Sequence, residues 1–109
     1  MATYLLIFRS PHDYKPSPET GAAWSAWHQG LGAQLRDRGN PVFRSQVLGG
    51  EVGDTALGGY SLIRAADLDA AVAVAKTCPG LESGMTVEVG EVTNSDDSFD
   101  AWLAAHPSG

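Results

Sequence analysis

The residue best suited to acid/base chemistry in this sequence is His28, because an imidazole gains or loses a proton near neutral pH. Trp24, Trp27, Leu31 and Leu35 surround it at i, i+3, i+7 and i+11, which predicts one apolar helical stripe. At about 100° per residue, His28 falls on the edge of this stripe and should point toward a sheet. We therefore take His28 as a candidate general base. A hydrogen-bonded histidine at the edge of the core is the alternative, since no acidic neighbour in the sequence orients it.

Further polar residues follow the stripe and could bind a substrate. Arg44 lies in a predicted strand, where a long cation marks a sheet edge, forms a salt bridge or binds an anion such as a carboxylate. Asn40 precedes Pro41 and is also typical of a turn. Tyr60 and Ser61 lie in a later strand and should point to opposite faces. The predicted pocket between sheet and first helix is lined by Trp24, Trp27, Asn40, Arg44 and Tyr60.

A second candidate is the pair His12 and Asp13, in a loop that also holds Pro11 and Pro16. Adjacent side chains rarely point the same way, so a direct His–Asp dyad is not expected here. The loop is expected to be solvated, with a lid as the alternative.

The sequence predicts neither a metal site nor a cofactor. His12, His28 and His106 are scattered, and no His-x-x-x-His, Cys-x-x-Cys or glycine-rich nucleotide motif occurs. Haem would need His28 as its axial ligand, which only an analogy of fold could suggest. The single cysteine, Cys78, is expected to be a half-buried small hydrophobic side chain, with a reactive thiol as the alternative, and a lone cysteine fits a reducing cytoplasm.

Length and charge limit the partners. The 109 residues predict one domain, and the net charge of -6, without any run of Lys or Arg, argues against nucleic acid and anionic membrane surfaces. No stretch approaches the length of a membrane span, and residues 1–10 do not resemble a signal peptide. A cytoplasmic location is the expectation.

The first predicted strand, residues 3–9, is apolar on both faces. One face carries Tyr4, Leu6 and Phe8, and the other carries Leu5 and Ile7. Such a strand needs a cover on each side, and in so short a chain the second cover is most easily a partner subunit. The pattern therefore predicts a homodimer, in which Tyr4 either lines the same cavity as Tyr60 or packs.

The remaining elements complete a βαββαβ order. A helix should begin at the Ser17 cap and continue through Leu35 to a Gly39 cap, with Gly32 allowing close approach to the sheet. Strands are expected over residues 42–48, 58–64 and 85–89. Asp67 should cap a second helix that buries Leu68, Ala71, Val72 and Ala75, and residues 97–105 predict a short C-terminal helix carrying Phe99, Trp102 and Leu103. This order predicts an α+β, ferredoxin-like fold.

Several stretches, in this order, resemble the DGPF-like branch of the YCII-related family. They are Trp24-x-x-Trp27 with Leu31-Gly32, Gly39-Asn40-Pro41, Gly59-Tyr60-Ser61, Asp67-Leu68-Asp69-Ala70-Ala71, Ala75-Lys76-x-Cys78-Pro79 and Gly84-x-x-Val87-Glu88-Val89. They span residues 3–92. The literal Asp-Gly-Pro-Phe motif is absent, and the corresponding region reads Gly53-Asp54-Thr55-Ala56-Leu57.

The resemblance implies a dimeric α+β barrel whose two sheets pack face to face. It implies no established reaction, although a His–Asp pair is suggested as the active site in the wider family and some related domains are associated with sigma factors. Our leading hypothesis is a dimer that binds a small organic molecule, with acid/base catalysis by His28 open. The alternatives are a non-catalytic interaction or regulatory module and a monooxygenase-like barrel.

Overall fold

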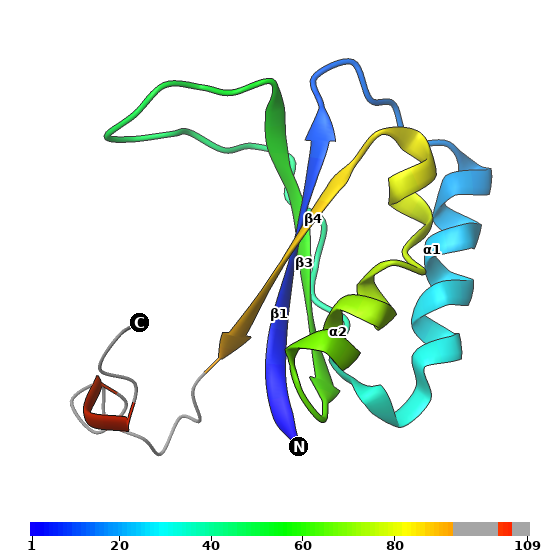
Figure 1. Ribbon diagram of the computed structural model, residues 1–109. Helices are drawn as coiled ribbons and strands as arrows, with labels where there is room; N and C mark the ends of the chain where they lie inside the picture. Colours follow the sequence, from blue (N-terminus) through cyan, green and yellow to red (C-terminus); the bar gives the residue numbers. More distant parts are fainter. Residues whose placement is uncertain (93–102, 106–109) are drawn as a thin grey trace.

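Figure 1 shows the computed structural model, which describes residues 1–92 and 103–105. Its strands are β1 (Ala2–Pro11), β2 (Leu35–Asp37), β3 (Thr55–Ala65) and β4 (Thr86–Val92), and its helices are α1 (Pro18–Leu31) and α2 (Leu68–Ala75). Short 3-10 turns follow the helices at Gly32–Gln34 and Pro79–Ser83. The strands form one antiparallel sheet in the order β2-β3-β1-β4. This confirms the predicted α+β fold of ferredoxin-like type.

One face of the sheet packs against both helices (Figure 1). The strand register places Leu6 opposite Ser61 on β3 and opposite Val89 on β4, so these side chains share that face. Leu6 and Ile63 are fully buried there. Tyr4 is also buried, at 3% exposure, and packs in the core instead of lining a cavity. The core residues are Tyr4, Leu6, Phe8, Ile63, Ala65, Ala71, Ala75, Cys78 and Met85.

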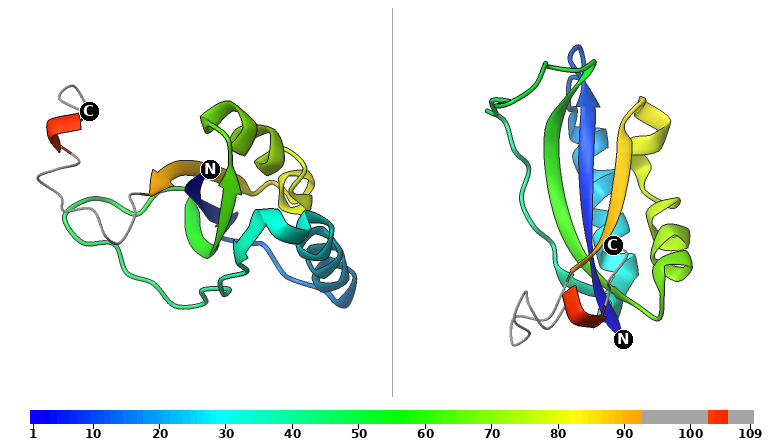
Figure 2. Two further views of the ribbon diagram at one scale, coloured as in Figure 1. Left: turned by 90° about the horizontal axis from the view of Figure 1, so that it is seen from below. Right: turned by 60° about the vertical axis from the view of Figure 1, so that its left-hand side comes forward.

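Neither α1 nor α2 covers the opposite face of the sheet (Figures 1 and 2). Leu5 pairs with Leu62 and Ile7 with Tyr60 on this face. Leu5, Ile7 and Leu62 are only half-buried, and Tyr60 is 37% exposed. The predicted two-faced character of β1 is therefore present. The partner subunit expected to cover this face stays a prediction.

Helix α1 begins as expected and ends earlier than expected. The Ser17 hydroxyl oxygen accepts a hydrogen bond from the Thr20 amide at 3.2 Å, which caps the first turn. The helix stops at Leu31 because Gly32 adopts a positive φ of 56°, so the prediction of a helix extending to Gly39 is wrong. Nothing lies within 4 Å of a Cβ built at Gly32, so close approach to the sheet is not its role. Leu35 belongs to β2.

The strand predicted over residues 42–48 is absent. The second strand is instead Leu35–Asp37, and the chain from Val42 to Leu48 forms part of a long loop that extends away from the sheet (Figures 1 and 2). Only the base of this loop is attached, where the Val42 amide donates to the Gly58 carbonyl at 3.0 Å. Polar residues 44–46 interrupt the apolar alternation that a half-buried strand requires. Phe43, in the same loop, is 84% exposed.

The second half of the fold follows the sequence closely. Asp67 caps α2 by accepting from the Ala70 amide at 2.8 Å, and Ala71 and Ala75 are buried as predicted. Leu68 is 51% exposed, contrary to expectation. Of the C-terminal helix predicted over residues 97–105, only 103–105 lie within the described residues, and these are helical. No helix in the described part of the chain is both long and apolar enough to cross a membrane.

Candidate functional site

A cavity of about 480 Å³ lies between α1 and the sheet. Its walls come from β1, β3, one side of α1, the loop between β1 and α1, and the segment that follows β2. Its lining includes aromatic, polar and basic side chains: Phe8, Ser10, His12, Tyr14, Thr20, Trp24, His28, Arg38, Asn40, Tyr60, Ser61 and Met85. The volume lies in the range of small-molecule sites, about 300–1,000 Å³.

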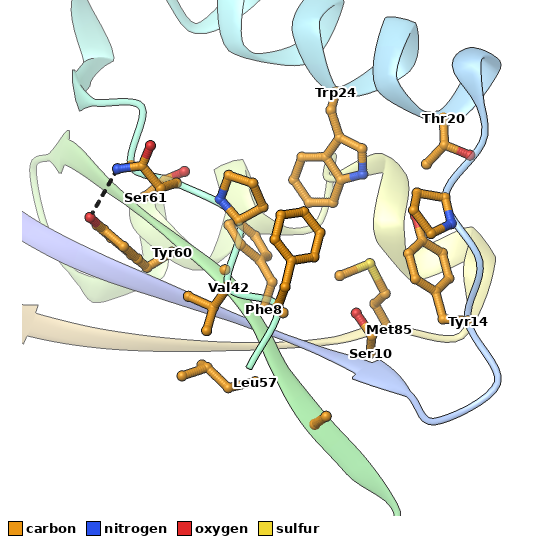
Figure 3. Close-up of a pocket in the computed structure, with 18 of the residues that line it drawn as sticks. Phe8, Ser10, Tyr14, Thr20, Trp24, Val42, Leu57, Tyr60, Ser61 and Met85 are labelled. Carbon is orange, nitrogen blue, oxygen red and sulfur yellow. Dashed lines mark hydrogen bonds between the residues drawn. The ribbon is translucent and has the colours of Figure 1, made fainter. Parts of the chain in front are cut away.

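Aromatic rings form the apolar wall of this cavity. Figure 3 shows Phe8 projecting from β1 toward Trp24, which projects from α1 in the opposite direction. Their ring centroids are 4.9 Å apart in an edge-to-face arrangement with an interplanar angle of 75°. The predicted lining residue Trp27 is not among the lining residues. Its indole Nε1 donates to the Thr77 hydroxyl at 2.8 Å, so Trp27 connects α1 to the chain just after α2.

His28 joins α1 to β3 within the cavity wall. Its Nε2 lies 3.3 Å from the Ser61 hydroxyl oxygen, and that hydroxyl donates to the Arg38 carbonyl at 2.6 Å. The other ring nitrogen, Nδ1, is buried and has no hydrogen-bond partner among the described residues. His28 therefore lies at a junction of three elements: α1, β3 and the segment after β2.

The surroundings of His28 favour the neutral ring. Burial lowers the pKa of His28 below its ordinary value, and the positive charge of Arg38 lowers it further. The Trp24 carbonyl, one helical turn earlier, favours the charged ring slightly, but it makes no hydrogen bond of normal geometry with Nδ1. His28 is thus a neutral imidazole at neutral pH.

Asn40 and Tyr60 provide a polar pair at another part of the wall. The Asn40 side-chain amide donates to the Tyr60 hydroxyl at 3.3 Å, as the dashed line in Figure 3 marks. Gly39 makes this pairing possible: its φ is 71°, and a Cβ built on it would overlap the Tyr60 carbonyl oxygen. The role expected for Gly39, a helix cap, is therefore wrong. This glycine lets the segment after β2 lie directly against β3.

The arginine that lines the cavity is not the one predicted from the sequence. Arg44 lies in the exposed loop and is not among the lining residues, because the strand expected to carry it does not form. Arg38 lines the cavity instead, and its guanidinium lies 3.5 Å from the Ser25 hydroxyl. Sequence reasoning missed Arg38. The available signal was its position immediately before Gly39-Asn40-Pro41, one of the stretches that carry the family resemblance.

His12 lines the cavity from the loop between β1 and α1. Its Nε2 lies 2.9 Å from the Gly53 carbonyl and donates to it, so this loop is tied to the base of the long loop before β3. Asp13 does not line the cavity. The His12–Asp13 segment is therefore a loop that contributes one residue to the wall, and no dyad forms from these two residues.

The charge of the cavity wall differs from that of the whole chain. Among the described residues, the lining includes Arg38, His12 and His28 but no Asp or Glu, although the chain carries a net charge of -6. The described residues also contain no group of three or more His, Cys, Asp or Glu side chains placed to hold a metal ion. The wall is thus aromatic, polar and free of acidic groups in the described part.

Comparison with known proteins shows the fold and nothing finer. No protein-family model matches the chain, and no curated protein matches it at a significant level. Among solved structures, it is similar to 5-chloro-2-hydroxyhydroquinone dehydrochlorinase (TftG) from Burkholderia phenoliruptrix AC1100 in complex with 2,5-dihydroxybenzoquinone. The TM-score is 0.56 at 19% sequence identity, and the match covers 84% of this chain and 95% of the other. The similarity therefore supports the ferredoxin-like α+β architecture.

Proposed function

We propose that this protein binds a small, planar organic anion, such as an aromatic carboxylate or an ionised hydroxyquinone, in the cavity between α1 and the sheet. The observation that carries the proposal is the sign of the charge on the wall. The chain has a net charge of -6, yet Arg38, His12 and His28 line this cavity and no acidic residue of the described part does. Anions are the ligands that such a wall attracts.

The remaining lining residues suit a flat molecule. The ring of Trp24 and the edge of Phe8 offer apolar contact area to a ring of similar size. The guanidinium of Arg38 can pair with a carboxylate or phenolate oxygen, to which its planar donors are matched. Asn40 and Tyr60 add polar groups that can orient the ligand.

The structural neighbour supports a ligand of this kind. That protein is a 5-chloro-2-hydroxyhydroquinone dehydrochlorinase in complex with 2,5-dihydroxybenzoquinone, and both compounds are small rings bearing several oxygens. A ligand of the same shape fits the volume of about 480 Å³ in this chain. Because the fold alone does not determine function, the proposal depends on the wall residues and needs a direct test.

Ligand titration followed by tryptophan fluorescence tests the proposal, since Trp24 lies in the wall. We expect saturable quenching or thermal stabilisation with benzoate or 2,5-dihydroxybenzoquinone, and a much weaker response to neutral benzamide. Arg38→Gln should weaken anion binding by about tenfold, the factor that about 1.4 kcal/mol produces. Arg44→Gln is the matched control and should bind normally. Equal binding of benzoate and benzamide, or no binding of either, would contradict the proposal.

We further propose that His28 assists proton transfer at this site. Its imidazole lies in the cavity wall, and its surroundings favour the neutral ring. Histidine is the side chain that most often takes part in proton transfer in enzymes. Phenylpyruvate, an aromatic anion with exchangeable hydrogens beside its carbonyl, is a suitable probe. The wild-type protein should accelerate their exchange with deuterium, and His28→Gln should lose that acceleration. A wild-type protein that binds phenylpyruvate without accelerating exchange would support a non-catalytic binding module instead.

A homodimer and membership of the YCII-related family remain proposals as well, as does a cytoplasmic location. The dimer would bury the uncovered sheet face, where Leu5, Ile7 and Leu62 are half-buried. Ile7→Lys should convert a dimer to a monomer in light scattering after size exclusion. Leu68→Lys, at an exposed leucine of α2, is the control and should leave the mass unchanged. A monomeric wild-type protein would overturn the dimer.

A further inference from the structure

Ser61 occupies an unusual position for a small hydroxyl residue. It is 1% exposed, and its hydroxyl has two neighbours from different elements. The Arg38 carbonyl oxygen lies 2.6 Å away, and Nε2 of His28 lies 3.3 Å away on α1. Ser61 also lines the cavity, as does His28.

The Ser61 hydroxyl has a single proton, so it can donate in only one of these two hydrogen bonds. A carbonyl oxygen can only accept, so the short contact to Arg38 requires that Ser61 donates its proton there. The hydroxyl then has only lone pairs to offer His28. A favourable contact with Nε2 therefore requires that Nε2 carries the ring proton and donates it to Ser61.

The other ring nitrogen supports this assignment independently. Nδ1 is buried and has no partner in the described part of the chain. A proton on Nδ1 would have only the Trp24 carbonyl nearby, which makes no hydrogen bond of normal geometry with it, so this buried donor would stay poorly satisfied at a cost of up to about 1–3 kcal/mol. A bare lone pair at that position is the milder alternative, because under-satisfied acceptors are tolerated more readily than orphaned donors.

We propose that Ser61 is a positioning residue that holds neutral His28 as its Nε2–H tautomer, so that the ring meets an anionic ligand as a hydrogen-bond donor and not as a base. The tautomer stands on the contacts of the ligand-free protein, whereas the role toward a ligand rests on the proposed function. This reverses the role expected for His28 from the sequence. For Nε2 to donate to a ligand, a ligand oxygen must replace the Ser61 oxygen as its acceptor. The hydrogen bond between Nε2 and Ser61 is long, at 3.3 Å, and therefore weak, so its replacement costs little free energy.

A neutral donor suits the ligand class inferred for this cavity. Arg38 supplies the positive charge, and the imidazole adds a directional hydrogen bond to an oxygen that becomes more negative during proton transfer. In a site of this kind the ring stabilises an enolate or phenolate without itself becoming charged. Because Nε2 of His28 already carries a proton, the proton that leaves the ligand passes to a water molecule or a buffer base.

Long-range hydrogen–nitrogen NMR spectra of the ligand-free, ¹⁵N-labelled protein at about pH 8 test the tautomer directly, because neutral histidine predominates there. His28→Gln removes one ring and so assigns the signals. We expect Nε2 of His28 to show the shift of a protonated nitrogen and Nδ1 that of a bare one. Ser61→Ala should move His28 toward a mixture of tautomers, and Ser61→Thr, which retains the hydroxyl, should restore the Nε2–H form.

Three results would overturn the proposal: an Nδ1–H tautomer in the wild-type protein, an unchanged tautomer in a folded Ser61→Ala variant, or anion binding that leaves the Nε2 signals unmoved. If Ser61→Ala does not fold, the wild-type spectrum alone decides the tautomer. A benzoate titration in the same spectra separates this proposal from the proposed function. The Nε2–H tautomer without any benzoate binding would remove the function and retain the role of Ser61.

Discussion

Trp24 and Trp27 lie one turn apart on α1, and they serve different surroundings. Both rings lie near Phe8 and His28, but Trp24 lines the cavity, with its ring centroid 4.9 Å from that of Phe8. Trp27 lies outside the lining and hydrogen-bonds to Thr77 near the end of α2. Helix α1 thus has a cavity side and a packed side, although both sides carry a tryptophan.

The difference between the two sides lies in what faces them. On the packed side, the chain just after α2 meets α1, where the Thr77 hydroxyl accepts a hydrogen bond from the Trp27 indole. On the cavity side, β3 presents the small residues Gly59 and Ser61, and the segment after β2 lies against Gly59. Small residues in the sheet leave room for a cavity where that segment cannot fill it. The contrast predicts distinct consequences for substitutions on each side.

The largest expected effect is on the cavity side. Gly39→Ala should destabilise the fold by about 3–5 kcal/mol, because an alanine must adopt positive φ and displace the Tyr60 backbone. Gly32→Ala is the control: its φ is also positive, but the space around it is open, so a loss of only about 1–2 kcal/mol is expected. Urea denaturation measures both. Equal losses for the two variants would show that the contact of Gly39 with β3 contributes nothing.

On the packed side, Trp27→Ala should cost about 3 kcal/mol, the lower end of the range for a buried tryptophan, since Trp27 is only half-buried. We expect this variant to keep its affinity for benzoate as long as it is folded. Trp24→Ala should show the reverse, with a smaller loss of stability and a larger loss of binding. Thermal unfolding with and without benzoate compares the two variants. If both variants lost binding equally, the two sides of α1 would not be separate.

The smallest expected effect is a pH dependence from His28. Because its pKa is lowered in the folded protein, the unfolded chain takes up the proton first as pH falls. The stability from this group is therefore complete above about pH 6.5 and decreases from there toward the lowered pKa of the folded state. His28→Gln should flatten the decrease in melting temperature as the pH falls below about 6.5. A slope that persists in His28→Gln would assign it to other groups.

Most of the fold could be predicted from the sequence, because its signals are local. Ser17 and Asp67 cap the two helices through side-chain oxygens placed three residues before the amides that they accept from. The alternation of β1 and the buried positions Ala71 and Ala75 follow from periods of 2 and 3.6 residues. Apart from the exposed Leu68, the errors fall between Gly32 and Leu48. There, a positive φ at Gly32 ended the helix early, and polar residues 44–46 left the next segment without a strand partner.

The site was harder to predict than the fold. Asn40, Tyr60, Trp24 and His28 do line one cavity, but the error in strand position moved Arg44 out of it and brought Arg38 in. The partner of His28 could not be read from the sequence, because Ser61 is 33 residues away and meets it only through the pairing of β3 with its neighbours. Contacts at such separation depend on register, which small residues such as Gly39 and Gly59 adjust.

The sequence by itself therefore determined the order of elements, the two apolar faces of the first strand, and the position of His28 beside two tryptophans on one helix. Those features depend on periodicity and capping, which act over a few residues. Only the tertiary structure decided which tryptophan faces the cavity, which arginine gives it charge, and that the Ser61 hydroxyl meets both His28 and the Arg38 carbonyl. These outcomes depend on where α1 and the segment after β2 lie over β3. Hydrogen-bond direction in a buried network is fixed by all its members together.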